Sequence, residues 1–248
     1  RVTDSRIIGN QSGFYAGGVF FNGEGSVLNN CLLADNNAVA AAGGIFFNIG
    51  GQANNCVIIR NSSFNGGGVY HISGGKLYLS TVVSNTAGGE GGGIYMLTAG
   101  GQVRDTIIYF NSASASKNYS RASDVLYSCT TPALPGAGNT DGDPQFVDMA
   151  NDDFHLMTGS PCIDSGTNLT AVTFDLEGNP RPLNGTGFAT TNYDMGAHEY
   201  TGGHTDQDGQ SDQDEIIAGT DPYSSTNYFR WQSVGTGPTN VVLGWLSA

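Results

Sequence analysis

Basic residues are scarce in this chain of 248 residues, which has nine Lys and Arg against 22 Asp and Glu and a net charge of −13. Binding to a phosphate backbone requires clustered cations, so nucleic acid is a poor partner, and an anionic membrane surface is equally poor. No apolar run approaches the roughly 18 residues of a membrane-spanning helix. A cation such as calcium suits this charge balance better.

The motifs of several enzyme classes are also absent. The chain has no His-Glu-x-x-His pair for zinc, no Gly-x-Ser-x-Gly elbow, and no Gly-Lys-Ser/Thr after its glycine-rich runs. His71, His155 and His198 show no metal-ligand spacing and are interpreted as structural hydrogen-bonding residues. No signal peptide precedes Arg1, so we expect a mature or trimmed fragment.

A repeat of 25 residues organises the first half of the chain. Its first marker is a position followed by two apolar residues and, shortly after, an asparagine. The marker positions are Cys31, Cys56, Thr81 and Thr106, with Arg6 extending the series, and the asparagines are Asn10, Asn36, Asn61, Asn85 and Asn111. The second marker is a Gly-Gly-x-aromatic motif at 17–20, 43–46, 67–70 and 92–95. Two markers that recur with the same period predict stacked coils.

Short β-branched and aromatic runs between Gly, Asn and Ser are typical of strands and turns. The sequence therefore predicts an all-β protein, a single-stranded right-handed parallel β-helix with about 25 residues per coil. The Gly pairs allow tight or left-handed corners, and Asn tolerates positive φ at others. The column of Asn30, Asn55, Ser80 and Asp105 predicts a further corner.

Two adjacent apolar columns raise a question of direction. One contains Leu32 and Val57, and the next contains Leu33 and Ile58. Neighbouring residues of a flat strand point to opposite faces. Either the chain bends there, or one column faces outward and is covered.

The repeats of residues 1–111 resemble the polymorphic outer-membrane-protein repeats of autotransporter adhesins and, more broadly, the pectin-lyase-like β-helix superfamily. This resemblance implies the fold and leaves the function open. The downstream motifs are DPQFVD (143–148), DFHL (153–156), SPCIDSG (160–166), DLEGNPRP (175–182) and YDMGAHEY (193–200). Their order resembles the C-terminal part of secreted bacterial proteins called choice-of-anchor Q domain proteins, which implies secretion.

An acidic segment at 206–215 resembles a thrombospondin type 3-like or EF-hand-like calcium loop. The residues expected to bind Ca²⁺ are Asp206, Asp208, Gln210, Asp212 and Glu215. The family pattern places another Asp where this chain has His204, and a solvated acidic linker is the alternative. The expected organisation is regular coils at 1–128, irregular coils at 129–202, the acidic loop at 203–222 and strands of a truncated further domain at 223–248.

Aromatic residues supply the most function-like pattern. Phe20, Phe46, Tyr70 and Tyr95 share a phase, each after an inward Val or Ile, so alternation points them outward as a ladder. Exposed rings would suit the faces of pyranose sugars or a protein partner. The alternative is ring stacking that only stabilises the coils.

The cysteines and the charged pairs suggest little chemistry. Cys31 and Cys56 share a phase, and parallel Cβ vectors on stacked strands give a poor disulfide dihedral, so free buried thiols are favoured over disulfides. Asp35 and Arg60 stack on neighbouring coils as an expected surface ion pair. No carboxylate pair of the kind that a glycosidase needs is visible in the sequence, although neighbouring coils could supply one.

Three functions follow from these patterns. The first is an extracellular or cell-surface β-helix module, expected to be monomeric, that engages polysaccharide or a cell-surface glycan through the aromatic face. The second is a polysaccharide lyase or glycoside hydrolase, for which no catalytic residue is assigned. The third is a structural or adhesive surface segment.

Overall fold

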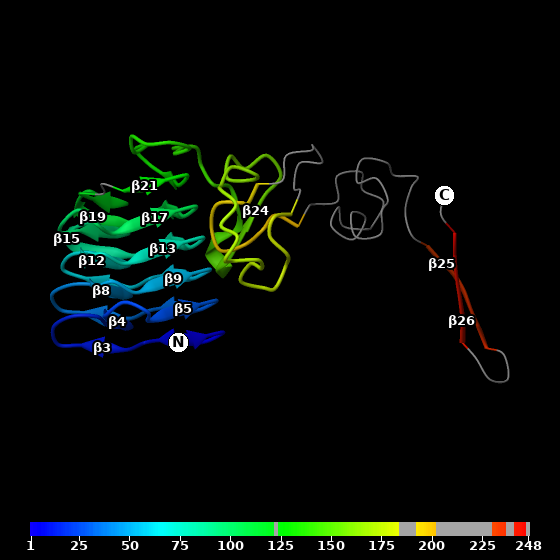
Figure 1. The fold of residues 1–248 in the computed structure, drawn as a ribbon, viewed down its shortest axis with the longest axis horizontal. Helices are drawn as coiled ribbons and strands as arrows, with labels where there is room; N and C mark the ends of the chain where they lie inside the picture. The colour runs from blue at the N-terminus through cyan, green and yellow to red at the C-terminus, as the bar shows by residue number, and fades with distance from the viewer. Residues whose placement is uncertain (122–123, 184–191, 202–229, 237–240, 247–248) are drawn as a thin grey trace. The chain divides into compact units, whose positions relative to one another are not determined.

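The computed structural model describes residues 1–121, 124–183 and 192–201 together with the strands at 230–236 and 241–246. The chain forms two compact units, Arg1–Tyr200 and Thr201–Ala248. The first unit is a β-solenoid in which each full coil contributes one short strand to each of four parallel sheets (Figure 1). The predicted all-β parallel β-helix is therefore confirmed. Among the described residues, no helix has the length and hydropathy needed to cross a membrane.

Sheets 1 to 4 are numbered in the order in which the chain enters them along one coil. Sheet 1 contains β1 (Val2–Thr3), β5 (Val27–Asn29), β9 (Gln52–Asn54), β13 (Lys76–Tyr78), β17 (Gln102–Arg104) and β21 (Val125–Leu126). Sheet 2 contains β2 (Arg6–Ile8), β6 (Leu32–Ala34), β10 (Val57–Ile59), β14 (Thr81–Val83), β18 (Ile107–Tyr109) and β22 (Cys129–Thr130). Sheet 3 contains β3 (Gln11–Ser12), β7 (Asn37–Ala38), β11 (Ser62–Ser63), β15 (Thr86–Glu90) and β19 (Ser112–Ala115). Sheet 4 contains β4 (Val19–Asn22), β8 (Ile45–Ile49), β12 (Val69–Ser73), β16 (Ile94–Met96) and β20 (Tyr119–Ser120).

The strand register corrects the predicted series at two positions. Arg6 pairs with Leu32 and so lies one position away from the column of Cys31. Val57 pairs with Leu32 and with Thr81, and Thr81 pairs with Ile107. Thr81 therefore lies one position away from the expected column, and Ser80 takes its place. The Ser80 hydroxyl accepts a hydrogen bond from the backbone N–H of Cys56 at 3.2 Å. The coil that ends at Ser80 is one residue shorter than the 25-residue repeat, and the next coil is one residue longer. Thr106 therefore returns to the predicted column.

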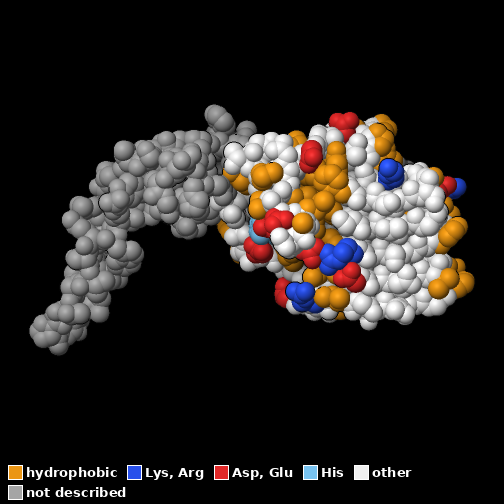
Figure 2. All heavy atoms as spheres, turned by 180° about the vertical axis from the view of Figure 1, so that it is seen from behind, with side chains coloured by type: hydrophobic (Ala, Val, Ile, Leu, Met, Phe, Trp, Pro, Cys, Tyr) orange, Lys and Arg blue, Asp and Glu red, His pale blue; other side chains and the backbone are white. Residues whose placement is uncertain are grey.

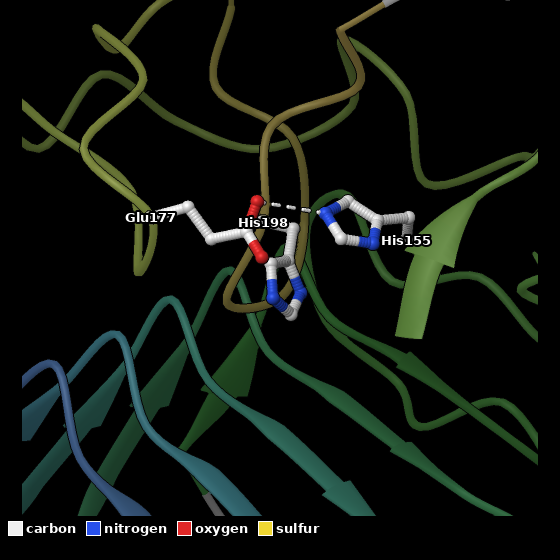
Figure 3. Close-up of side chains that lie close together, drawn as sticks. All are labelled: His155, Glu177 and His198. Atoms are coloured by element: carbon white, nitrogen blue, oxygen red, sulfur yellow. Dashed lines mark hydrogen bonds and ion pairs between the residues drawn. The ribbon is translucent and has the colours of Figure 1, made fainter. Parts of the chain in front are cut away.

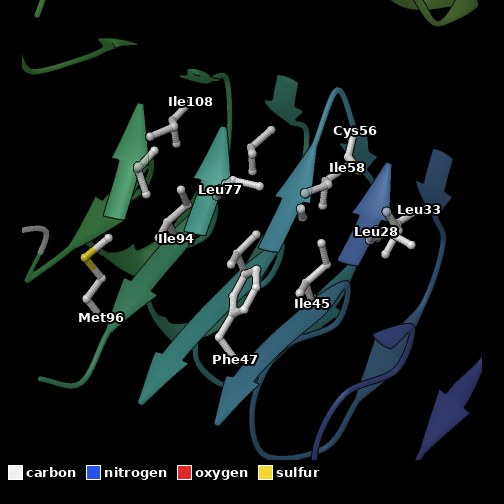
Figure 4. Packing of buried hydrophobic residues seen from close by; sticks show 14 of the residues in the cluster. Leu28, Leu33, Ile45, Phe47, Cys56, Ile58, Leu77, Ile94, Met96 and Ile108 are labelled. Atoms are coloured by element: carbon white, nitrogen blue, oxygen red, sulfur yellow. The ribbon is translucent and has the colours of Figure 1, made fainter. Parts of the chain in front are cut away.

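The open question about the two apolar columns is resolved by the covering of one of them. Leu33, Ile58, Val82 and Ile108 point inward and pack with residues of sheets 1 and 4 such as Leu77, Ile45 and Phe47 (Figure 4). The neighbouring residues Val57, Ile59, Val83 and Ile107 point outward from sheet 2, where the C-terminal segment of the unit buries them.

That covering segment is irregular. It contains β23 (Phe146–Asp148), a short 3₁₀ turn, η1 (Met149–Asn151), and β24 (Asp153–Leu156), which pairs antiparallel with β23. Phe146, Phe154 and Leu156 pack on the outward side chains of sheet 2. Sheet 2 thus lies between two apolar layers, which explains why its strands are apolar on both faces.

Asparagine side chains form a ladder inside the solenoid. Asn36, Asn61 and Asn85 are fully buried. The Oδ1 atom of Asn61 accepts the backbone N–H of Asn36 at 3.0 Å and its side-chain Nδ2 at 2.9 Å. The same pair of bonds links Asn61 to Asn85 at 2.9 and 3.0 Å. Each amide therefore joins one coil to the next without leaving a buried polar atom unpaired.

The corners differ in detail from the sequence interpretation. The ladder asparagines do not adopt positive φ; the residues before them do, including Asp35 (57°) and Arg60 (52°). The paired glycines of the Gly-Gly-x-aromatic motif serve close approach rather than left-handed backbone, because a Cβ on Gly43 would lie 2.5 Å from the Gly67 carbonyl oxygen. Asn30, Asn55 and Asp105 do occupy a left-handed corner, as expected, with φ of 51°, 48° and 51°, but Leu79 (50°) takes the place that was predicted for Ser80.

The C-terminal motifs that resembled a secreted family form a buried polar network. The Arg181 guanidinium pairs with the Glu199 carboxylate, and both side chains are fully buried. Arg181 also donates to the Gly196 carbonyl at 2.9 Å, and Glu199 accepts the backbone N–H of Leu183 at 2.9 Å. Removing either charged partner would leave a buried charge uncompensated.

Hydrogen bonds also anchor this segment to the coils. The Asp105 carboxylate accepts the backbone N–H of Thr167 at 2.7 Å and its hydroxyl at 2.8 Å. The hydroxyl of Thr81 accepts the backbone N–H of Ala197 at 3.0 Å. Burial raises the pKa of Asp105 to about 6, although its bonds to Thr167 act in the opposite direction.

The four cysteines are buried free thiols. The thiols of Cys31 and Cys56 each approach a backbone carbonyl, at 3.1 and 3.2 Å. The favoured interpretation of this pair is confirmed. In the second unit, β25 (Arg230–Thr236) and β26 (Val241–Leu246) pair antiparallel.

The ladder leads to a stability prediction on two neighbouring asparagines. Asn36→Ala should lower the free energy of unfolding by about 2–3 kcal/mol, because it removes the buried amide that bonds the backbone N–H of Asn10, the Ile7 carbonyl and the Oδ1 atom of Asn61. Asn37→Ala is the matched control, since Asn37 is exposed and donates to the Ser62 hydroxyl at 2.7 Å. Chemical denaturation measures both; equal losses would contradict a special role for the ladder.

Candidate functional site

The aromatic ladder exists as a continuous stack. The ring centroids of Phe20 and Phe46 lie 5.0 Å apart, those of Phe46 and Tyr70 5.2 Å, and those of Tyr70 and Tyr95 4.8 Å. All three pairs are close to parallel, with interplanar angles of 9°, 3° and 18°. Parallel strands in register place these rings one above the other.

The expected exposure of this ladder is wrong for three of its four members. Phe46, Tyr70 and Tyr95 keep 1%, 9% and 6% of their surface, whereas Phe20 keeps 46%. Alternation correctly points the rings away from the core, but stacking places each ring face against the next ring. Ala41 and Ala42 pack beside the stack, and the Arg121 guanidinium lies 5.8 Å from the Tyr95 ring centroid. A sugar would find the free ring face of Phe20 rather than a row of faces.

A shallow groove follows the coil corners where sheet 4 leads into sheet 1. It has a volume of about 360 Å³ and spans four coils. Its lining consists of Glu24, Gly25, Ser26, Val27, Gly50, Gly51, Gln52, Gly74, Gly75, Lys76, Gly100 and Gln102. We call it the glycine groove. The sequence motifs did not predict this groove, although the Gly-Gly pairs at 50–51, 74–75 and 100–101 recur with the repeat.

The glycines are required because aromatic rings lie directly beneath the groove. A Cβ on Gly51 would lie 2.7 Å from the Phe21 ring, and one on Gly75 would lie 2.6 Å from the Phe47 ring. Gly51 and Gly75 also have φ of 89° and 84°, which side chains disfavour. The floor of the groove is therefore bare backbone.

Phe21 and Phe47 stack beneath the groove, and His71 continues this stack on the next coil. Its ring stacks on Phe47 at 4.5 Å, and its Nδ1 atom lies 3.1 Å from the Gly74 carbonyl oxygen. Burial lowers the pKa of His71 to about 4, so the ring is neutral at physiological pH. His71 is thus a structural hydrogen-bonding residue, as the sequence suggested.

The walls of the groove carry polar side chains. Gln52 donates to the Asn54 side chain at 2.8 Å, and Gln102 accepts the Tyr78 hydroxyl at 2.7 Å. Both amides are held in place by these bonds and keep further donors or acceptors. Lys76 and Glu24 add one charge of each sign. The groove can therefore exchange hydrogen bonds with a ligand that is rich in hydroxyl groups.

A second group of chemically active side chains lies in the covering segment. One ligand atom each of His155, Glu177 and His198 lies within 4.8 Å of the others (Figure 3). The two imidazole rings are 4.4 Å apart. In the part of the chain that the structure describes, no other group of three His, Cys, Asp or Glu residues meets this criterion. We call it the His-Glu cluster.

Hydrogen bonds orient one imidazole of this cluster. His155 places Nδ1 2.6 Å from an Asp153 carboxylate oxygen and Nε2 3.0 Å from a Glu177 carboxylate oxygen. Burial alone would lower the pKa of His155, but these two carboxylates outweigh it and raise the pKa above its ordinary value. Burial, with the neighbouring His155 as a second cause, lowers the pKa of His198 to about 4.

The sequence interpretation of His155 and His198 as structural residues missed this arrangement. The two histidines belong to different motifs, and Glu177 comes from a third. Their meeting depends on the packing of two irregular loops against strand β24, which no spacing rule describes. The one signal in the sequence was that His155, Glu177 and His198 each lie in one of the downstream motifs at 153–156, 175–182 and 193–200.

Two further sites were predicted from the sequence, an ion pair and a calcium site. Asp35 and Arg60 form the expected ion pair across coils, at 3.0 Å with both side chains about half exposed, and Asp152 joins them. The calcium site expected at Asp206, Asp208, Gln210, Asp212 and Glu215 lies outside the described residues. It stays a prediction.

The buried aromatic stack leads to a prediction of stability. Phe46→Ala should lower the free energy of unfolding by about 3–5 kcal/mol, because it opens a cavity and removes a ring from between two neighbours. Phe20→Ala is the control, since this ring is about half exposed at the end of the stack. Thermal or chemical unfolding separates the two; a larger loss for Phe20→Ala would contradict the burial.

No family model, no curated protein and no solved structure matches this chain.

Proposed function

We propose that this protein is an extracellular β-helix module that binds a neutral polysaccharide along the glycine groove. The observation that carries the proposal is a groove of about 360 Å³ that spans four coils, with a glycine floor and two wall amides, Gln52 and Gln102. The resemblance of residues 143–200 to secreted bacterial proteins supports the extracellular setting.

The geometry suits a polymer because the groove crosses successive coils. Neighbouring strands in a sheet lie about 4.8 Å apart, so equivalent groups recur at that interval along the solenoid. Gln52 and Gln102 occupy equivalent positions two coils apart, with Lys76 between them. A ligand with repeating units would meet repeating contacts, whereas a small molecule would use only part of the groove.

The charge distribution favours a neutral glycan over a polyanion. The chain carries a net charge of −13, so an acidic polysaccharide would be repelled at long range. Within the groove, Lys76 and Glu24 balance one another. Bare glycine backbone and amides remain for hydroxyl groups, which need hydrogen bonds rather than ion pairs.

Binding without cleavage is favoured because the described residues of the groove lack a pair of carboxyl groups. Hydrolysis of a glycosidic bond commonly requires two carboxyl groups on either side of it. The groove lining contains one carboxylate, Glu24. Lys76 is the one basic side chain of the lining, and it supports a polysaccharide lyase as the second candidate function because such enzymes need a base.

Affinity electrophoresis and calorimetry with neutral glycans such as β-glucan, xylan and mannan test the binding, with polygalacturonate as the acidic comparison. We expect retention by at least one neutral glycan. The double variant Gln52→Ala and Gln102→Ala should weaken it by roughly tenfold or more, because each lost hydrogen bond contributes about 1 kcal/mol.

Phe20→Ala is the control that separates the groove from the aromatic ladder. If binding uses the groove, this variant keeps the wild-type affinity, and circular dichroism shows all variants folded. Loss of binding in Phe20→Ala alone would move the site to the ladder. Release of new sugar ends from any glycan would favour the enzyme, and absence of retention by every glycan would refute the proposal.

A further inference from the structure

We propose that His155, Glu177 and His198 bind a divalent transition metal ion of the zinc type. The proposal is independent of the glycine groove, which none of these residues lines. It starts from three ligand atoms that lie within 4.8 Å of one another although they come from strand β24 and two separate loops.

The set of donor atoms selects the kind of metal. Two imidazole nitrogens and one carboxylate oxygen are ligands of zinc and similar ions, whereas calcium takes six to eight oxygen atoms. The cluster is therefore distinct in chemistry from the acidic segment at 206–215. Three protein ligands also leave a coordination position to water or to an external molecule.

Asp153 orients His155 as second-layer carboxylates orient histidine ligands in metal sites. Its carboxylate accepts Nδ1–H of His155 at 2.6 Å, which directs Nε2 toward Glu177 at 3.0 Å. The same oxygen accepts the backbone N–H of His155 at 3.1 Å. A hydrogen bond at one ring nitrogen fixes the tautomer and frees the other nitrogen for a metal.

A buried carboxylate holds the other two loops together. Asp175 is fully buried, and one of its oxygens accepts the backbone N–H of Glu177 at 2.9 Å. Its other oxygen accepts the backbone N–H of Glu199, the residue after His198, also at 2.9 Å. One side chain thus positions the backbone beside two of the three ligands, so the cluster is built into the fold.

His198 supplies an independent sign of a missing partner. Only 7% of the His198 surface is exposed, and its Nδ1 atom has no hydrogen-bond partner among the described residues. A buried polar nitrogen without a partner costs free energy, so His198 carries a donor or acceptor capacity that the described residues leave unused. His155 and Glu177 are more open, with side-chain exposures of 34% and 51%, which leaves an entrance for the ion. Figure 2 shows histidine atoms beside acidic side chains at the surface of this unit.

Metal titration of the full chain tests the proposal. The protein is stripped with a chelator, supplied with excess calcium so that oxygen-only sites are filled, and titrated with Zn²⁺ by calorimetry. We expect one zinc ion per chain that calcium does not displace. Titration with Co²⁺ should give the visible absorption of a four-coordinate site.

Variants at the partly exposed ligands avoid the risk of unfolding that His198 carries. His155→Ala and Glu177→Gln should each weaken zinc binding by at least tenfold, and Asp153→Asn should weaken it by about 10–100-fold as an orienting residue. Glu24→Gln is the matched control, an acidic residue of the groove that should leave binding unchanged.

Two outcomes would overturn the proposal. Stoichiometric zinc binding that survives both His155→Ala and Glu177→Gln would place the ion elsewhere. Absence of zinc binding in the folded wild-type chain would leave the contact between His155 and Glu177 as an ordinary ion pair.

Discussion

Hydrogen bonds parallel to the solenoid axis hold neighbouring coils in register, and the other features of the first unit depend on that register. Backbone bonds link strands of the same sheet, and the buried asparagines add a second set at the corner before sheet 3. Because the coils are locked in phase, rings stack on rings and glycines stack on glycines. The glycine groove is therefore a product of periodicity rather than of a single loop.

The covering segment changes this regular object into one with a chemically distinct region. It buries the outward face of sheet 2 with apolar side chains and fixes itself through Asp105 and Thr81. Its own framework is polar and buried, centred on Arg181, Glu199 and Asp175. The His-Glu cluster lies where this framework reaches the surface. A coil alone presents repeated side chains, whereas β24 and the two loops beside it bring unlike side chains together.

The regular part of the fold was predictable because its information is local and repeated. The asparagines and the Gly-Gly pairs each recur in phase, so the coil length followed from the sequence even though one coil is a residue short at Ser80. The direction of the aromatic ladder was predictable from alternation, but its exposure was not, since burial of Phe46 depends on neighbouring rings. The His-Glu cluster escaped prediction for a related reason: His155, Glu177 and His198 have no common period and meet only through tertiary packing.

The direction of the asparagine ladder has an electrostatic consequence. From Asn10 to Asn111, each side-chain amide donates one N–H to the Oδ1 atom of the next asparagine along the ladder, the last of which is Asn118. The same nitrogens of Asn36, Asn61, Asn85 and Asn111 also donate to backbone carbonyls of the preceding coil. The side-chain dipoles are thus aligned head to tail, as peptide dipoles are in an α-helix, whereas the strands around them largely cancel. Reversing one amide would oppose oxygen to oxygen on one side and nitrogen to nitrogen on the other. The column therefore has one polarity along its whole length, with its positive end directed at the Thr131 carbonyl that accepts the last amide at 2.8 Å.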